Sequence, residues 1–107
     1  MFARVCEVHF KPEKKAEVFK MLREEIVPML EQCDGFFDEI ALDLDTHPRK
    51  FYAISLWRDE RAAEKYAKEC FPKIYDMLEP FLVAAIGVKH GTIDETISKK
   101  FVTPIAA

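Results

Sequence analysis

Glycine and tryptophan are scarce in this sequence of 107 residues, which holds three glycines and one tryptophan. Half of the residues are hydrophobic, so the composition is that of a folded globular protein and not of a disordered or low-complexity chain. Two domains of half this length would each be hard to stabilise. The sequence therefore predicts a single globular domain.

The sequence also lacks a large net charge and a long apolar run. The formal net charge is −3, and both signs are mixed along the chain, which argues against the basic surface of a nucleic-acid-binding protein. No segment approaches the roughly 20 apolar residues of a membrane span, and the N-terminus has no basic region followed by an apolar run. We expect neither nucleic acid nor a membrane as a partner.

Closely spaced cysteines are missing as well. Cys6, Cys33 and Cys70 lie far apart and form no Cys-x-x-Cys pair. An odd number of scattered cysteines argues against the disulfide framework of a secreted protein, and structural zinc favours closely spaced ligands. We therefore expect a cytoplasmic protein with reduced cysteines and no metal site.

The pattern of the apolar residues predicts six elements. Alternation with a period of two predicts strands at residues 3–10, 37–44, 50–57 and 85–92. Apolar residues at spacings of three and four predict helices over residues 12–33 and 59–81. The second and third strands are separated by five residues rich in turn formers, so they should form a hairpin.

Capping residues and prolines should shape both helices. Pro28 lies inside the apolar stripe of the first helix, where it removes a backbone hydrogen bond, so we expect a kink near residues 24–25. Asp59 is placed to cap the second helix by accepting hydrogen bonds from amides of its first turn. The segment Cys70-Phe71-Pro72 should divide that helix in two.

The resulting order, β-α-β-β-α-β, is that of a ferredoxin-like α+β domain, in which both helices cover one face of an antiparallel sheet. The first strand has apolar residues on both of its faces, so the uncovered face would leave an apolar patch on a monomer. Two sheets packed face to face would bury it, which predicts a homodimer. We expect this domain over residues 1–93. Residues 94–107 should form a tail that packs through Phe101, Val102 and Ile105 on the domain or on the partner subunit.

Four short motifs carry a resemblance to a known family. They are Phe10-Lys11-Pro12, Asp34-Gly35-Phe36, Ser55-Leu56-Trp57 and Asp59-Glu60-x-Ala62-Ala63. In their order and spacing the chain resembles the antibiotic-biosynthesis monooxygenase family, over roughly residues 2–93. The resemblance implies a dimeric α+β barrel. The family includes cofactor-free oxygenases, haem-degrading oxygenases, isomerases and stress-responsive barrels without established chemistry, so the fold alone does not choose an activity.

The chain departs from the haem-degrading members at three positions. Those members carry an asparagine on the first strand, a tryptophan in the second helix and, further along, an iron-ligating histidine. The matching positions here hold Cys6, Tyr66 and Tyr75. None of the three histidines of the chain falls in the second helix. We therefore expect the protein to bind no haem and to use no cofactor.

The remaining candidate site is aromatic. A cofactor-free oxygenase needs an apolar pocket, polar groups that orient an electron-rich ring and at most one base. We interpret Trp57 and Tyr66 as the catalytic residues. The predicted substrate-binding residues are His9, Ser55, Phe71 and Tyr75. The same side chains also suit a packed core, because large aromatic residues dominate cores by area.

Three functions stay open at this point. The first is a cofactor-independent monooxygenase that acts on a small electron-rich aromatic substrate, such as a quinol or a polyketide-like compound. The second is a non-catalytic barrel that binds a small ligand or acts in stress response, and the third is a small-molecule isomerase. A pocket lined by Trp57 and Tyr66 would favour chemistry, whereas a filled core around them would favour the second function.

Overall fold

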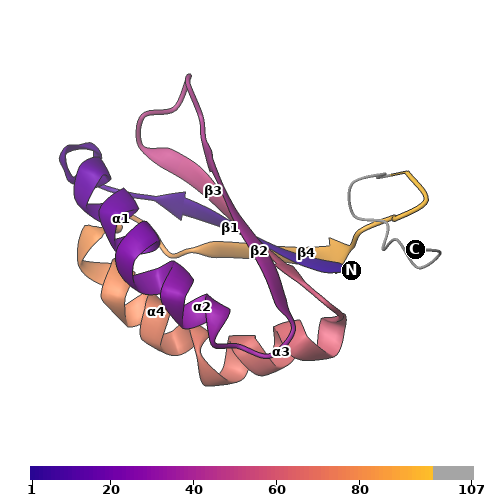
Figure 1. Ribbon diagram of the computed structural model, residues 1–107. Coiled ribbons are helices and arrows are strands. Elements are labelled where there is room, and N and C mark those ends of the chain that lie inside the picture. The colour runs from indigo at the N-terminus through magenta and orange to yellow at the C-terminus, as the bar shows by residue number, and fades with distance from the viewer. Residues whose placement is uncertain (98–107) are drawn as a thin grey trace.

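Four strands form one antiparallel sheet in the computed structural model, which describes residues 1–97 (Figure 1). The strands are β1 (Phe2–His9), β2 (Phe36–Asp43), β3 (Lys50–Trp57) and β4 (Gly87–Thr92). Their order in the sheet is β2-β3-β1-β4, with every neighbouring pair antiparallel. Helices cover one face of the sheet (Figure 1), so the predicted ferredoxin-like α+β fold is confirmed.

The first helical segment changes its winding along its length. It consists of η1 (Pro12–Lys14), α1 (Lys15–Met21), the π-helical η2 (Leu22–Ile26) and α2 (Val27–Glu31). Pro28 has no amide hydrogen to donate to the carbonyl of Glu24, and the wide turns of η2 lie at that point. The helix is therefore irregular at residues 24–25, where a kink was predicted.

The second helical segment is divided where the sequence predicts. It consists of α3 (Glu60–Glu69), α4 (Phe71–Leu78) and the short η3 (Glu79–Phe81). The Oδ1 atom of Asp59 accepts a hydrogen bond of 2.8 Å from the amide of Ala62, which confirms the predicted cap. Pro72 lies in the first turn of α4, where its missing amide hydrogen breaks no helical hydrogen bond.

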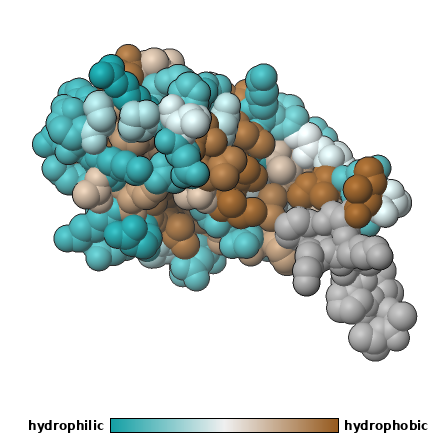
Figure 2. Space-filling view, turned by 90° about the horizontal axis from the view of Figure 1, so that it is seen from above, coloured by the Kyte–Doolittle hydropathy of each residue, from teal (hydrophilic) through white to brown (hydrophobic). Residues whose placement is uncertain are grey.

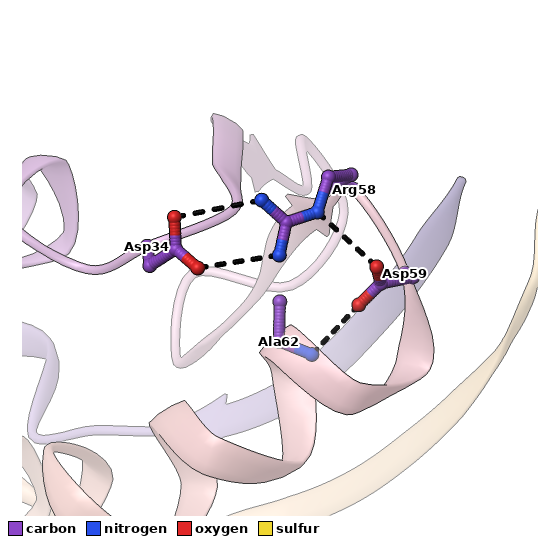
Figure 3. Close-up of polar contacts among 4 residues, drawn as sticks. All are labelled: Asp34, Arg58, Asp59 and Ala62. Carbon is purple, nitrogen blue, oxygen red and sulfur yellow. Dashed lines mark hydrogen bonds and ion pairs between the residues drawn. The ribbon is translucent and has the colours of Figure 1, made fainter.

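A polar clamp fixes the point at which β3 ends and α3 begins (Figure 3). Guanidinium nitrogens of Arg58 lie 3.2 Å from a carboxylate oxygen of Asp34 and 3.1 Å from one of Asp59. The backbone amide of Arg58 donates a hydrogen bond to the carbonyl of Gly35. Gly35 has a φ of 83°, and a Cβ atom there would lie 2.5 Å from the Cβ of Ala62. Only glycine fits this turn. Two of the four family motifs therefore have a structural role.

The core lies between the helices and the covered face of the sheet. One aromatic cluster joins Phe51 to Phe10 and Phe19, with ring centroids 5.6 and 5.0 Å apart. A second cluster surrounds Trp57, which is completely buried, and Tyr66 stacks on its ring at 4.6 Å. These clusters pack α1 and α3 against β3.

The opposite face of the sheet carries no helix and is apolar in its middle. Ile40, Ile54 and Val5 form a row across β2, β3 and β1, because the register pairs them directly. Ile40 is 39% exposed and Leu42, on the same face, is 48% exposed. Figure 2 looks down on this face and shows brown apolar surface in its middle, beside teal hydrophilic surface. We call it the open face.

The chain after β4 returns to the N-terminus. The amide of Ile93 donates to the carbonyl of Met1 at 2.8 Å, and the terminal ammonium of Met1 lies 3.4 Å from Glu95. The predicted packing of Phe101, Val102 and Ile105 falls outside the described residues. Among residues 1–97, no helix has the length and apolar character needed to cross a bilayer.

Candidate functional site

A row of polar residues crosses the covered face of the sheet. The register pairs Glu39 with Ser55, Ser55 with Arg4, and Arg4 with His90, so one residue comes from each strand. Paired residues of antiparallel strands point to the same side. The adjacent row, formed by Phe36, Trp57 and Phe2, belongs to the core. Glu39, Ser55, Arg4 and His90 are called the polar row below.

An internal cavity of about 40 Å³ lies beside this row, between the sheet and the helices. Its polar lining comes from Glu39, Ser55, Tyr66 and Cys6, and the rest of its wall is aliphatic or aromatic. This volume suits a water molecule or dioxygen and is too small for an aromatic ring.

Glu39 is the group in the cavity wall that is best suited to accept a proton. Burial, together with the smaller effect of the negative charge of Asp38, raises the pKa of its carboxyl from 4.5 to about 7. A carboxyl with a pKa near neutrality can both accept and return a proton at physiological pH. Glu39 is not among the site residues predicted from the sequence, because it lies with Asp43 on the polar side of the second strand, a pattern typical of a solvent-exposed face.

Within residues 1–97, Arg4 is buried without a carboxylate partner. The side chain is 8% exposed, and its Nε atom has no hydrogen-bond acceptor within residues 1–97. The guanidinium carbon lies 4.9 Å from the centre of the Phe71 ring and 5.5 Å from that of Tyr66. Cation–π contacts offset part of the cost of burying this charge.

Tyr66 and Cys6 stay protonated at neutral pH. Burial raises the pKa of Cys6 to about 11, and burial also raises the pKa of Tyr66 above its ordinary value of 10. In both cases the positive charge of Arg4 opposes the shift without cancelling it. Both groups therefore act as hydrogen-bond donors and not as bases.

Four of the predicted site residues come together around the cavity. Ser55, Tyr66 and Phe71 line it. Trp57 lies behind this wall, stacked on Tyr66, and its Nε1 atom donates a hydrogen bond of 2.8 Å to the Oγ of Ser55. Because the Ser55 oxygen accepts this bond, its own proton is free for another acceptor. Trp57 is thus a core residue that positions two residues of the cavity wall.

Two predicted site residues lie elsewhere. His9 is on the open face, since alternation along β1 turns it away from its neighbour Val8, and its Nε2 atom lies 3.0 Å from Glu7. Tyr75 meets the Phe71 ring edge-on, and its hydroxyl accepts a hydrogen bond of 3.3 Å from the amide of Ile86. Neither side chain lines the cavity.

His9, His47 and His90 all lie outside α3 and α4. Within the part of the chain that the structure describes, no three histidine, cysteine, aspartate or glutamate side chains are grouped to hold a metal ion.

The fold and this cavity define an α+β protein of the ferredoxin-like class, in which helices and sheet enclose a small apolar cavity with polar groups. Residues 1–69 match the family model described as antibiotic biosynthesis monooxygenase. The match spans more than half of the 107 residues, and the chain belongs to this family. None of the curated proteins matches the sequence significantly.

Solved structures support the same fold. The chain is similar to a monooxygenase from the ActVA-Orf6 gene of Streptomyces coelicolor, solved with nanaomycin D (TM-score 0.72, 14% identity, 86% of each chain). It is also similar to the haem degrader MhuD of Mycobacterium tuberculosis, solved with two haems (0.72, 10%, 88% of this chain and 96% of that one). A protein of unknown function from Nitrosomonas europaea has a TM-score of 0.73 at 15% identity, over 87% and 88%. At these identities the likeness extends to the fold alone.

Proposed function

We propose that this protein is a cofactor-independent monooxygenase of a small electron-rich aromatic substrate, of the quinol or polyketide-like phenol class. Membership of the family supports a monooxygenase-like activity. The observation that carries the proposal is the apolar cavity whose wall holds one carboxyl, Glu39, beside the hydroxyl donors Ser55 and Tyr66. A phenol needs a proton acceptor before it reacts readily with dioxygen, and these groups supply one together with two donors.

The chemistry needs no bound cofactor, because the substrate supplies the electrons. The phenol proton passes to the Glu39 carboxylate, which leaves an electron-rich phenolate. Dioxygen then adds at a ring carbon that carries hydrogen. The O–O bond of this adduct then breaks. One oxygen atom stays on that carbon as a carbonyl, and the other takes up the hydrogen of that carbon and the proton held by Glu39 and leaves as water, so the phenol becomes a quinone. Ser55 and Tyr66 donate hydrogen bonds to the oxygen that carries the negative charge.

The cavity must widen to admit such a substrate. Its volume of about 40 Å³ accepts dioxygen but no aromatic ring. The lining residues Phe71 and Ile86 are only half-buried, so their side chains can move with little loss of core packing. Trp57 and Phe51, in contrast, have no exposed surface and hold the remaining wall in place.

We also propose that the protein acts as a homodimer joined through its open face. The apolar row of Ile40, which is exposed, and of the half-buried Val5 and Ile54 supports this arrangement, since monomers rarely leave an apolar patch of this kind uncovered. An obligate interface of this type commonly buries more than about 2,000 Å² in total. A monodisperse monomer in light scattering at micromolar concentration would contradict the dimer.

Oxygen uptake with a panel of phenols and hydroquinones tests the activity. The protein should consume oxygen with at least one phenol and form the quinone, seen by mass spectrometry. Glu39→Gln should lower the rate by about 10²- to 10⁴-fold, the usual contribution of a general base. Glu31→Gln, at an exposed position on α2, is the matched control and should keep the rate. Absence of oxygen uptake over the whole panel would overturn the proposal.

One observation favours a second function, a barrel that binds a small ligand without chemistry. Trp57 is completely buried, and the cavity behind Tyr66 is small, as in a filled core. In that case ligands should stabilise the protein in thermal melts while no phenol is consumed.

A further inference from the structure

A second concavity lies on the other side of the polar row. It is a groove of about 380 Å³ between β1, β4 and α3, and it is open to solvent. This volume falls within the usual range of small-molecule sites, unlike that of the internal cavity. Phe2, Ala63 and Ala67 give the groove an apolar floor. We call it the Arg4 groove, because the Arg4 side chain lines it.

The groove holds a cation that lacks an anion. Only 8% of the Arg4 surface is exposed, and no carboxylate forms an ion pair with it among residues 1–97. Its Nε atom is buried without an acceptor. A guanidinium offers five N–H donors in a fork that matches a carboxylate. Buried charges are normally paired, so the missing partner points to a ligand.

The other charges of the groove limit what that ligand can be. Lys68 on α3 is balanced by the acidic side chains of Glu60 and Glu64 on the same helix, and all three are exposed. Polyanions such as nucleotides would be repelled by these acids. A ligand with a single negative charge directed at Arg4 would not be repelled. Near the floor, the Phe2 ring lies 5.6 Å from the ring of His90, which leaves an aromatic surface for a flat ligand.

We propose that the Arg4 groove binds a small aromatic monocarboxylate, with its carboxylate paired to the Arg4 guanidinium and its ring on the floor formed by Phe2 and Ala63. This site requires no oxygen chemistry and is separate from the cavity beside Glu39. It therefore stands or falls independently of the proposed monooxygenase activity.

Isothermal titration with benzoate tests the site, with benzamide and inorganic phosphate as comparison ligands. Benzoate should bind saturably at one site per chain. Benzamide has the same shape without the charge, and it should bind at least about tenfold more weakly, because charged hydrogen bonds are the stronger ones. Absence of saturable benzoate binding, or equal binding of benzamide or phosphate, would overturn the proposal.

Variants locate the ligand. Arg4→Gln should weaken benzoate binding by about tenfold or more, whereas Arg49→Gln in the β2–β3 turn is the matched control and should leave it unchanged. Ala67→Glu, on the groove floor and outside the core cluster, places a negative charge near the ligand and should also weaken binding. The Ala67→Glu variant still tests the site if Arg4→Gln does not fold. Unchanged affinity in Ala67→Glu, or a change seen only in Glu39→Gln, would place benzoate outside the groove and contradict the proposal.

Discussion

One row of residues on each face of the sheet departs from the usual arrangement, although the rest of the covered face packs the core. The face covered by helices carries the polar row of Glu39, Ser55, Arg4 and His90. The next row along the same strands, on the open face, is apolar across β2, β3 and β1. Ordinarily a half-covered antiparallel sheet buries its apolar side and exposes its polar side.

These two rows do not stabilise a monomer, so we interpret them as serving function. Removing the charges of Arg4 and Glu39 from water costs free energy, since neither has a partner of opposite charge within residues 1–97, so packing alone does not explain them. Exposing Ile40 and Leu42 is unfavourable for a monomer in the same way. The polar row on the covered face is consistent with ligand binding. The apolar row on the open face is consistent with contact to a second copy of the chain.

The largest expected effect comes from placing a charge on the open face. Ile54→Asp lies at the centre of the apolar row and would bury two carboxylates in a symmetric interface. The dimer dissociation constant should rise by about a thousandfold or more, because each buried, unpaired charge costs several kcal/mol. Analytical ultracentrifugation measures this change. Far-ultraviolet circular dichroism should show that the fold is retained, and a variant with unchanged dimer affinity would place the interface elsewhere.

Next in size is the loss of the core residue behind the cavity. Trp57→Ala should lower the free energy of unfolding by about 3 to 5 kcal/mol, because it removes a completely buried ring. Trp57→Phe keeps an aromatic surface against Tyr66 and should cost clearly less. Urea titrations give both values. Equal effects of the two variants would mean that the stacking on Tyr66 contributes little.

Glu39 should make stability depend on pH. Its pKa rises from 4.5 to about 7 on folding, so the folded state holds this proton more tightly than the unfolded state does. Stability therefore falls as pH rises through that range. Glu39→Gln removes this loss, and at pH 8 the variant should gain about 1 to 3 kcal/mol relative to its difference at pH 4.5. Denaturant titrations at both pH values check this, and a difference that stays constant with pH would contradict the burial of the carboxyl.

Removing the hydroxyl of Tyr66 should affect turnover more than folding. Tyr66→Phe keeps the stacked ring and deletes only the donor. If this donor stabilises a phenolate or peroxide, the rate should fall about ten- to a hundredfold. Thermal melts should change little in comparison. Full oxygen uptake in this variant would return Tyr66 to the core.

The smallest effect is expected at the rim of the covered face. The Lys15 ammonium lies 2.7 Å from Asp43, but both side chains are about two-fifths exposed. Lys15→Gln should therefore cost less than about 0.5 kcal/mol, in contrast to changes at the buried polar row. A loss above 1 kcal/mol in denaturant titration would show that this rim pair is shielded from solvent.

Local signals in the sequence predicted the elements well, because each depends on near neighbours. The Asp59 cap, the disturbance before Pro28 and the division of the second helix at Pro72 all follow from backbone hydrogen bonding within one or two turns. The turn at Gly35 likewise lies in the motif Asp34-Gly35-Phe36, which is visible in the sequence.

The site was less predictable, because alternation in a strand gives the period and not the side that is covered. Glu39, Ala41 and Asp43 form the polar side of β2, which resembles a solvent face, yet Glu39 borders the cavity. The sheet register that aligns Glu39 with Ser55 and Arg4 is a tertiary property. The apolar open face is the signal that would have assigned the polar side of β2 to the interior.

The most direct measurement of the central claim is the titration of the Glu39 carboxyl by carbon-13 nuclear magnetic resonance, with the signal assigned by its loss in Glu39→Gln. If the covered face holds a carboxyl ready to accept a proton at neutral pH, the titration midpoint should lie at about 7. A midpoint at the ordinary value of 4.5 would show a solvated surface carboxylate and contradict the account.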